Sequence, residues 1–292
     1  MKALSSPIPP IVRHRRRDRT CTLRRVPELP EVEYMRRRLQ RAMAGARITR
    51  VIVRRQTLRY PLPAGLAARL EGQTVRAVGR RAKYLVMELS SGERLLMHLG
   101  MSGWFRVMPA QLELHDHIVF EMSNGKVVAF NDPRRFGFML LLNADEHAGH
   151  KSLTRLGPEP LDKTFEAAAL ATALARRRTS LKVALADQRV VSGLGNIYVV
   201  EALHRARLSP KRRASTLVMS NGSPRPALYE LVDAIKDVLK EAIRRQGRPG
   251  DGNPFRIYDR EGEPCPRRGC RGRIRRITQA GRSTYYCPVC QR

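Results

Sequence analysis

Four cysteines near the carboxyl end set the strongest limit on how this chain can fold. They form a C-x4-C pair and a C-x2-C pair, and they are Cys265, Cys270, Cys287 and Cys290. Four thiolates in two close pairs are typical of a closed tetrahedral zinc site, which is structural rather than catalytic. Two disulfides or free thiols are the alternative, which the lack of a convincing secretion signal disfavours. We therefore predict one structural Zn²⁺ in a finger over residues 248–292, a stretch too short and polar for a large core.

The charge of the chain indicates what kind of partner it binds. Its 56 Lys plus Arg face 26 Asp plus Glu, which gives a net charge of +30. Such an excess favours a polyanion through phosphate neutralisation and counterion release. A merely soluble basic surface is the plainer interpretation. An acidic membrane surface is a third, although no apolar run approaches the about 20 residues that span a bilayer.

Hydrophobic periodicity predicts a leading helix and then an antiparallel β-sandwich over residues 27–145. The helix begins at Pro30, keeps Val32, Met35, Leu39 and Met43 on one face, and ends at Gly45. Glu31 and Glu33 complement the positive end of this helix. Short β-branched runs separated by Gly or Asn-Gly follow, and Ser123-Asn124-Gly125 predicts a hairpin turn.

The second half of the chain is predicted to be helical. A linker over 146–163 leads into helices over 164–247, with Thr164 as the cap of the first and Thr179 or Ser180 as the cap of the second. A third helix follows a glycine hairpin at 193–195, and a long amphipathic helix covers 226–247.

Several segments in a fixed order carry a resemblance to a known family. They are PELPEVE at 27–33, RRAKYL at 80–85, HLGMSG at 98–103, DPRRFG at 132–137, GLGNIY at 193–198 and the four-cysteine finger. With these segments the chain resembles the bacterial formamidopyrimidine-DNA glycosylases from Pro27 to Arg292. The resemblance implies an α+β multidomain fold: the β-sandwich, a helix–two-turns–helix domain and the zinc finger. It also implies a bifunctional DNA glycosylase and abasic-site lyase that excises oxidised purines, a monomer acting on damaged double-stranded DNA in the bacterial cytoplasm, at the nucleoid.

The resemblance implies four catalytic residues: Pro27, Glu28, Lys83 and Arg282. The amine of Pro27 would be the nucleophile that displaces the damaged base and forms a Schiff base with the sugar. Glu28 would protonate the sugar-ring oxygen, Lys83 would contact the lesion and a phosphate, and Arg282, at the tip of the finger, would clamp a phosphate. By themselves, Glu28 could be a helix N-terminal carboxylate and Lys83 an ordinary surface lysine.

The resemblance also implies a set of DNA-binding residues: His98, Met101, Arg134, Arg135, Phe136, Lys182 and Asn196. Of these, Met101, Arg134 and Phe136 would fill the hole that a flipped base leaves in the duplex. Core packing is the alternative for Met101 and Phe136, but both lie in turn-like sequence beside glycine, which favours exposure. Asn196 opens a helix, where free N–H groups bind phosphate, although it could be a simple N-cap.

The basic segment 1–26 conflicts with catalysis by Pro27. While Val26 precedes it, the nitrogen of Pro27 is an amide and cannot form an iminium. The composition of 1–26 suits a disordered basic arm or a transit peptide. We expect it to be an artefact of start-site assignment or to be removed by proteolysis.

Three other functions fit parts of the sequence. The sister group of oxidised-pyrimidine glycosylases shares the fold and chemistry, but PELPEVE and DPRRFG favour the purine branch. If residues 1–26 are retained, the chain would be an inactive DNA-damage-binding protein. A zinc-finger nucleic-acid-binding protein such as a ribosomal factor is the third, which the ordered motifs disfavour.

Overall fold

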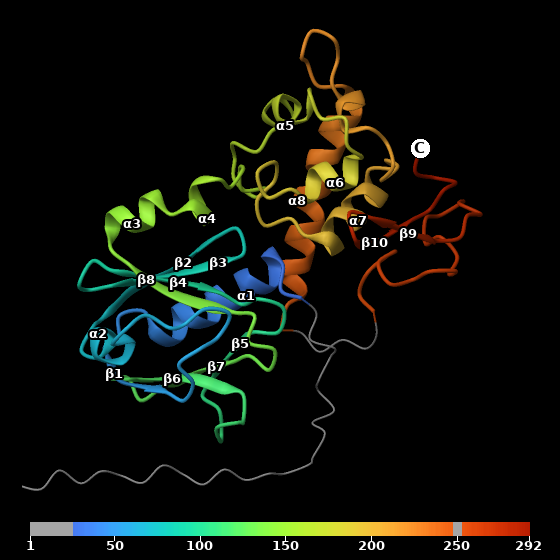
Figure 1. Cartoon of the computed structure of the whole chain (residues 1–292). Coiled ribbons are helices and arrows are strands. Elements are labelled where there is room, and N and C mark those ends of the chain that lie inside the picture. Colours follow the sequence, from blue (N-terminus) through green and yellow to red (C-terminus); the bar gives the residue numbers. More distant parts are fainter. Residues whose placement is uncertain (1–25, 248–252) are drawn as a thin grey trace, which may run out of the picture. The chain divides into compact units, whose positions relative to one another are not determined.

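The computed structural model describes residues 26–247 and 253–292, which form two compact units (Figure 1). The first unit holds Pro27, Met35–Gly79 and Leu85–Asn143, and the second holds Glu28–Tyr34, Arg80–Tyr84 and Ala144–Arg292. The second unit therefore borrows two short segments from the first half of the chain. The extension predicted over 1–26 lies outside the described residues except for Val26.

Helix α1 (Leu29–Met43) begins one residue before the predicted start at Pro30. Its apolar face is buried as the periodicity predicts, with Met35 and Leu39 inaccessible to solvent. Gly45 follows the helix with a φ of 78°, a left-handed conformation that glycine adopts without steric cost, and this confirms the predicted end.

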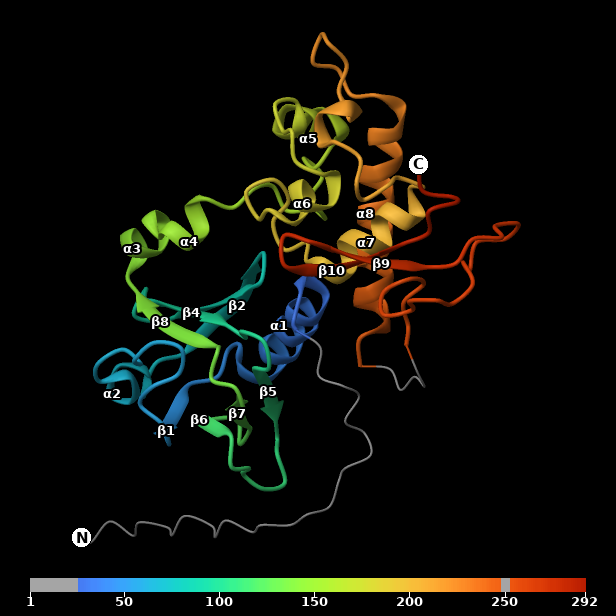
Figure 2. The ribbon, with the colours of Figure 1, turned by 45° about the vertical axis from the view of Figure 1, so that its right-hand side comes forward.

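The first unit contains two four-stranded sheets, drawn as separate layers in Figures 1 and 2. One has the strand order β1-β6-β7-β5 and the other the order β2-β3-β4-β8. The strands are β1 (Ile48–Val53), β2 (Val75–Arg81), β3 (Tyr84–Leu89), β4 (Arg94–His98), β5 (Trp104–Val107), β6 (Asp116–Met122), β7 (Val127–Asn131) and β8 (Phe138–Leu142). A short helix, α2 (Leu66–Leu70), follows β1.

The core of the first unit lies on the apolar faces of these sheets. β6 is buried along nearly its whole length. In the same sheet, the ring centroids of Phe105 and Phe130 lie 5.0 Å apart. The turn between β6 and β7 has Gly125 at φ 76°, as the Asn-Gly signal predicted. The predicted antiparallel sandwich with a leading helix is confirmed.

The second unit is built on helices. They are α3 (Ala144–Gly149), α4 (Lys151–Thr154), α5 (Ala167–Leu174), α6 (Leu181–Ala186), α7 (Asn196–Arg205) and α8 (Pro226–Arg245), with a 3₁₀ turn, η1 (Ala214–Leu217). Helices α5 to α8 and η1 bury their apolar faces in one core with Leu29 and Phe165, while α3 and α4 have no buried residues. Among the described residues, no helix combines the length and apolar composition needed to span a bilayer.

The predicted cap at Thr164 is wrong. α5 begins at Ala167 with Glu166 as its N-cap. The reason is Phe165, which is fully buried and whose N–H donates to the carbonyl of Asp162 in a turn that precedes the helix. Ser180 does precede α6, but its side chain makes no capping bond and accepts from Gln279 instead.

The finger contains a two-stranded antiparallel hairpin, β9 (Arg275–Gln279) and β10 (Arg282–Tyr286). Its small core combines Cys265, Cys287, Ile257 and Tyr285 with Val200 of α7. The finger therefore shares its packing with a helix of the same unit, as expected for a stretch too short for a core of its own.

Candidate active site

A buried carboxylate at the start of α7 is the centre of the site in the second unit. Glu28 is 4% exposed, and its carboxylate oxygens accept the backbone N–H groups of Ile197 at 3.0 Å and Tyr198 at 3.4 Å. The first N–H groups of a helix have no partner within the helix and attract negative charge. The sequence places Glu28 directly after Pro27, which is also buried.

Two glycines make room for this arrangement. A Cβ atom at Gly195 would overlap the carboxyl group of Glu28, and one at Gly193 would meet the side chain of Leu29 at 2.6 Å. Gly193 also has a φ of 77°. The glycine hairpin before α7 is therefore needed both for its backbone conformation and for the close approach of the Glu28 segment.

The surroundings of Glu28 alter its acidity. Burial raises the pKa of Glu28 above its ordinary value, while nearby Lys83, the amides of α7 and Arg282 act in the opposite direction. The net shift is upward, so this carboxyl keeps its proton at a higher pH than a solvated glutamic acid. A proton held in this way is what a general acid needs near neutral pH.

A second carboxylate, Glu31, lies beside Glu28 and was interpreted from the sequence only as a helix-end charge. Its side chain accepts from the Tyr198 hydroxyl at 2.6 Å, from Gln246 Nε2 at 2.7 Å and from the backbone N–H of Glu28 at 3.0 Å. Burial raises the pKa of Glu31 to about 7. Glu31 follows Glu28 by three residues, the spacing of a capping box. This spacing could have predicted the bond from the Glu28 N–H to the Glu31 side chain.

Cationic side chains surround the two carboxylates. Lys83 lies in the turn between β2 and β3, as predicted, and burial together with Arg282 lowers its pKa, while Glu28 raises it. Lys182 of α6 is buried, and its pKa falls to about 8, first because of burial and then because of Arg282. Such a concentration of positive charge is suited to phosphate groups.

Asn196 links the start of α7 to the finger. Its Nδ2 donates to the backbone carbonyl of Ser283 at 2.9 Å. Arg282, the neighbour of Ser283, is exposed and begins β10 directly after the hairpin turn, which confirms its predicted place at the tip. The N-cap of α7 is Gly195, so the alternative of Asn196 as a simple N-cap is wrong.

The first unit presents the remaining predicted residues on two adjoining loops. Met101 is 37% exposed and Phe136 is 42% exposed, as their turn-like sequence predicted, so neither is a core residue. The guanidinium of Arg134 lies 4.9 Å from the centre of the Phe136 ring. A buried carboxylate, Asp132, holds these loops by accepting from Ser102 Oγ at 2.5 Å and from the N–H of Gly137 at 2.8 Å.

Two further predicted residues lie at or beside these loops of the first unit: His98 ends β4, and Arg135 lies in the loop before β8. His98 accepts the N–H of Gly100 at 3.0 Å and stacks on Phe138 with a centroid distance of 5.4 Å. Arg135 has a φ of 57°, unusual for a residue with a Cβ, and its N–H donates to the carbonyl of Asp132. Asp132, which sequence reasoning did not single out, is the common anchor.

The four cysteines come together as their spacing predicted. Their sulfur atoms lie within 4.8 Å of one another, with 3.8 Å between Cys265 and Cys290 and 3.6 Å between Cys270 and Cys287. A tetrahedron with Zn–S bonds of about 2.3 Å needs about 3.8 Å between sulfurs, so the residues fit zinc. Gly272 leaves room for Cys287, because a Cβ there would approach its sulfur to 2.5 Å.

The chain matches three known domain families in succession. Residues 26–139 match the formamidopyrimidine-DNA glycosylase N-terminal domain, 156–250 the formamidopyrimidine-DNA glycosylase H2TH domain, and 262–292 the zinc finger found in FPG and IleRS. Formamidopyrimidine-DNA glycosylase of Azorhizobium caulinodans is 52% identical and that of Rhodopseudomonas palustris (strain BisB18) 54% identical. Each match covers 91% of this chain and 100% of the relative.

Solved structures show the same likeness. Lactococcus lactis formamidopyrimidine-DNA glycosylase, non-covalently bound to DNA with an abasic site, is 33% identical with a TM-score of 0.79. MutM in complex with DNA containing carbocyclic 8-oxo-G is 32% identical with a TM-score of 0.78. Both cover 91% of this chain and 100% of the solved chain.

Proposed function

Because the chain belongs to the formamidopyrimidine-DNA glycosylase family, we propose that it excises oxidised purines from DNA and then cleaves the abasic site through a Schiff base on Pro27. Base-excision repair of oxidised purines follows from the family and from the damaged DNA in its solved members. The lyase step and the roles of individual residues are the proposal. The observation that carries it is the buried carboxylate of Glu28, next to Pro27 in the chain and bound by the first backbone N–H groups of α7.

Pro27 supplies the nucleophile in the proposed mechanism. The lone pair of its secondary amine forms a bond to C1′ as the bond from C1′ to the base breaks, and the bonding electrons leave with the base. An α-amine has an ordinary pKa near 8, so a useful neutral fraction exists at pH 7. In the Val26–Pro27 peptide bond this lone pair is delocalised into the carbonyl group and cannot attack C1′. The active form is therefore one in which that bond is absent.

Glu28 is the proposed general acid. The departing base takes up the proton of the Pro27 nitrogen, which becomes neutral. The proton of Glu28 then passes to the sugar-ring oxygen, and the ring opens to leave an iminium between Pro27 and C1′. Loss of a C2′ proton then expels the 3′ phosphate, and a second elimination expels the 5′ phosphate. The raised pKa of Glu28 supports this role because the carboxyl keeps its proton at a higher pH, and the bonds to the α7 amides support it because they fix the position of the carboxyl group.

The cations and loops would bind the DNA. Lys83, Lys182, Arg282 and Asn196 are proposed to hold phosphates beside the damaged nucleotide. Met101, Arg134 and Phe136 are proposed to replace the extruded base, since an apolar wedge and a ring recover stacking that flipping loses. Their exposure supports the proposal.

The four cysteines are proposed to hold one zinc ion. The fit of the sulfur positions and the match to a zinc finger support this. When bound, the ion supplies structural cross-linking, because a closed set of four thiolates leaves no open position for a substrate. Cys265, Cys270, Cys287 and Cys290 would be its ligands.

Borohydride trapping tests the proposed function. A chain beginning at Pro27 should form a covalent complex with 8-oxoguanine DNA, since hydride reduces the iminium to a stable amine. The same chain with Val26 and the preceding residues retained, verified by intact mass, should bind this DNA without being trapped. Trapping of the retained form would refute Pro27 as the nucleophile, and the wild-type Pro27 form failing to excise any oxidised base would refute the function.

Glu28→Gln separates acid catalysis from binding. We expect its single-turnover excision to fall by about 100-fold or more while the Kd for DNA changes little, because general acid catalysis contributes about 10²–10⁴-fold. An unchanged excision rate would remove Glu28 from the proposed role.

A further inference from the structure

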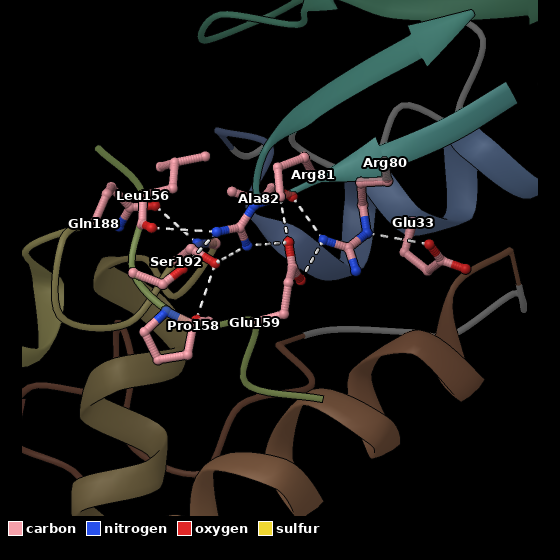
Figure 3. Close-up of polar contacts among 11 residues, drawn as sticks. Glu33, Arg80, Arg81, Ala82, Leu156, Pro158, Glu159, Gln188 and Ser192 are labelled. Carbon is pink, nitrogen blue, oxygen red and sulfur yellow. Dashed lines mark hydrogen bonds and ion pairs between the residues drawn. The ribbon is translucent and has the colours of Figure 1, made fainter. Parts of the chain in front are cut away.

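Two arginines and a buried glutamate form a polar cluster beside Lys83, shown in Figure 3. We name Arg80, Arg81, Glu159 and Ser192 the Glu159 brace. Every member belongs to the second unit, and Glu159 itself is 9% exposed. None of these residues has a place in the mechanism proposed above.

The carboxylate of Glu159 receives three donors. Its Oε1 accepts the backbone N–H of Ala82 at 2.5 Å and Arg81 Nη1 at 3.1 Å, and its Oε2 accepts Arg80 Nη1 at 2.9 Å. Arg80 also pairs through Nε with Glu33 at 3.1 Å. The two arginines and two glutamates are therefore balanced in charge, and the buried carboxylate is satisfied on both oxygens.

Ala82 has an unusual conformation that the brace holds from both sides. Its φ is 52°, in the left-handed region that residues with a Cβ atom seldom occupy. Its N–H is bound by Glu159, and its carbonyl accepts from Arg80 Nη1 at 2.9 Å. Lys83 is the next residue, so the direction in which its side chain leaves the turn depends on this conformation.

Arg81 connects the same turn to the segment before α7. Its guanidinium donates to the carbonyl of Gly157 at 2.6 Å and to Ser192 Oγ at 3.0 Å. Ser192 is followed by Gly193, whose carbonyl accepts the N–H of Leu29, next to Glu28. The chain of contacts therefore begins at Lys83 and returns to Glu28, the carboxylate that Lys83 faces.

A plain ion pair does not account for this arrangement. Buried ion pairs contribute little net stability, because desolvation offsets their attraction. A carboxylate that only balanced Arg80 and Arg81 would have no need of the Ala82 amide. Instead, one of its oxygens accepts the backbone N–H of the strained residue.

We propose that Glu159 is a positioning residue that holds Ala82 in the left-handed conformation and so directs the Lys83 amine toward Glu28. This inference rests on the proposed function only for the catalytic importance of Lys83; the placement of Lys83 is independent of it. The brace acts through Lys83 and does not touch the substrate.

Three substitutions in the chain that begins at Pro27 test the proposal. Glu159→Ala removes the carboxylate that accepts the Ala82 N–H, and Glu159→Gln keeps one oxygen for it. Ala82→Gly puts at position 82 a residue that adopts a positive φ without the bond to Glu159. Glu241→Ala is the matched control, because Glu241 accepts two bonds from Arg205, at 2.8 and 2.7 Å, elsewhere in the second unit. Each variant is compared by thermal unfolding, DNA Kd, single-turnover excision rate and acetylation of Lys83 followed by mass spectrometry.

We expect Glu159→Ala to lose about 10- to 100-fold in excision rate with a smaller change in Kd, as displaced catalytic groups do. Lys83, which is partly exposed in the wild type, should become acetylated several times faster, since its amine is no longer held in place. Glu159→Gln should keep more activity, and Ala82→Gly should restore about tenfold to the Glu159→Ala chain. Glu241→Ala should alter stability without changing Lys83 acetylation.

Unchanged Lys83 acetylation in folded Glu159→Ala, or no recovery on adding Ala82→Gly, would overturn the proposal. Should Glu159→Ala fail to fold, Glu159→Asp, whose shorter side chain withdraws the carboxylate from the Ala82 amide, gives the same comparison with and without Ala82→Gly, and equal Lys83 acetylation in both would overturn the proposal. A wild-type chain that excises nothing would instead refute the proposed function. The acetylation rates would still show whether Glu159 positions Lys83.

Discussion

Glu31 lies with Glu28, Tyr198 and Gln246, and burial there makes its charge depend on pH near neutrality. Burial raises its pKa to about 7 from an ordinary 4.5, so between these values the folded chain binds more protons than the unfolded chain. Stability from this group is therefore present below pH 4.5 and is lost as the pH rises toward 7. The full shift corresponds to about 3 kcal/mol.

Glu31→Gln should remove this part of the pH dependence. The measurement is thermal unfolding of the two proteins from pH 5 to 8. The Tm of the variant relative to that of the wild type should increase as the pH rises. Parallel Tm curves would show that Glu31 titrates at the same pH in the folded and unfolded chains.

Gly195→Ala should displace Glu28 from the start of α7. The added Cβ would overlap the Glu28 carboxyl group, so the acid must move or the helix must shift. We expect at least a tenfold fall in single-turnover excision, since small displacements of catalytic groups are costly. Gly149→Ala is the control, because a Cβ at that position meets nothing within 4 Å. Equal excision rates for Gly195→Ala and Gly149→Ala would show that a Cβ atom at position 195 does not displace Glu28.

At the scale of elements, the finger is held to α7 by bonds as well as by its metal ligands. Gln291 Nε2 donates to the carbonyl of Leu208 at 2.9 Å, and Asn196 donates to Ser283. The segment 256–258 is also fixed, since the buried Glu201 of α7 accepts its three successive N–H groups at 2.9 to 3.0 Å. The finger and the helix that binds Glu28 are therefore structurally linked.

Removal of zinc should unfold the finger and weaken DNA binding. Zinc ligation contributes about 10–16 kcal/mol in isolated fingers, much more than this small core can replace. After treatment with a chelator we expect rapid proteolysis within 262–292 and a Kd at least tenfold higher, both reversed by added zinc. A zinc-free protein with full DNA affinity would contradict this prediction.

At the scale of the whole molecule, the sequence predicted the parts whose signal is local. The cysteine spacing, the periodicity of α1 and the Asn-Gly turn each depend on neighbouring residues, and all three were confirmed. The brace could not be predicted, because Arg81 and Ser192 are far apart in the sequence and the RRAKYL segment gives no sign of which residues Arg81 contacts. The cap at Thr164 failed because burial of Phe165, a tertiary effect, outweighed local capping preference.

The substrate range is a property of the chain as a whole. The alignment with the Azorhizobium relative spans 293 positions but covers only 91% of the 292 residues here, so that relative carries residues that this chain lacks. We expect the missing residues to belong to the connection between α8 and the finger, which includes Asn253 and Pro254. We expect fewer contacts with an extruded 8-oxoguanine. The protein should therefore excise formamidopyrimidines and cleave abasic sites faster than it excises 8-oxoguanine. Single-turnover rates on the three substrates measure this, and a clear preference for 8-oxoguanine would contradict it.

The crowding of Glu28 against Gly195 also restricts how this protein can evolve. A side chain at position 195 and the carboxylate at position 28 compete for the same volume, so any residue other than glycine at 195 displaces the acid. We therefore expect lineages under selection for excision to keep glycine at 195. A descendant with alanine or serine there is expected to be a weakened enzyme, recognisable from one codon.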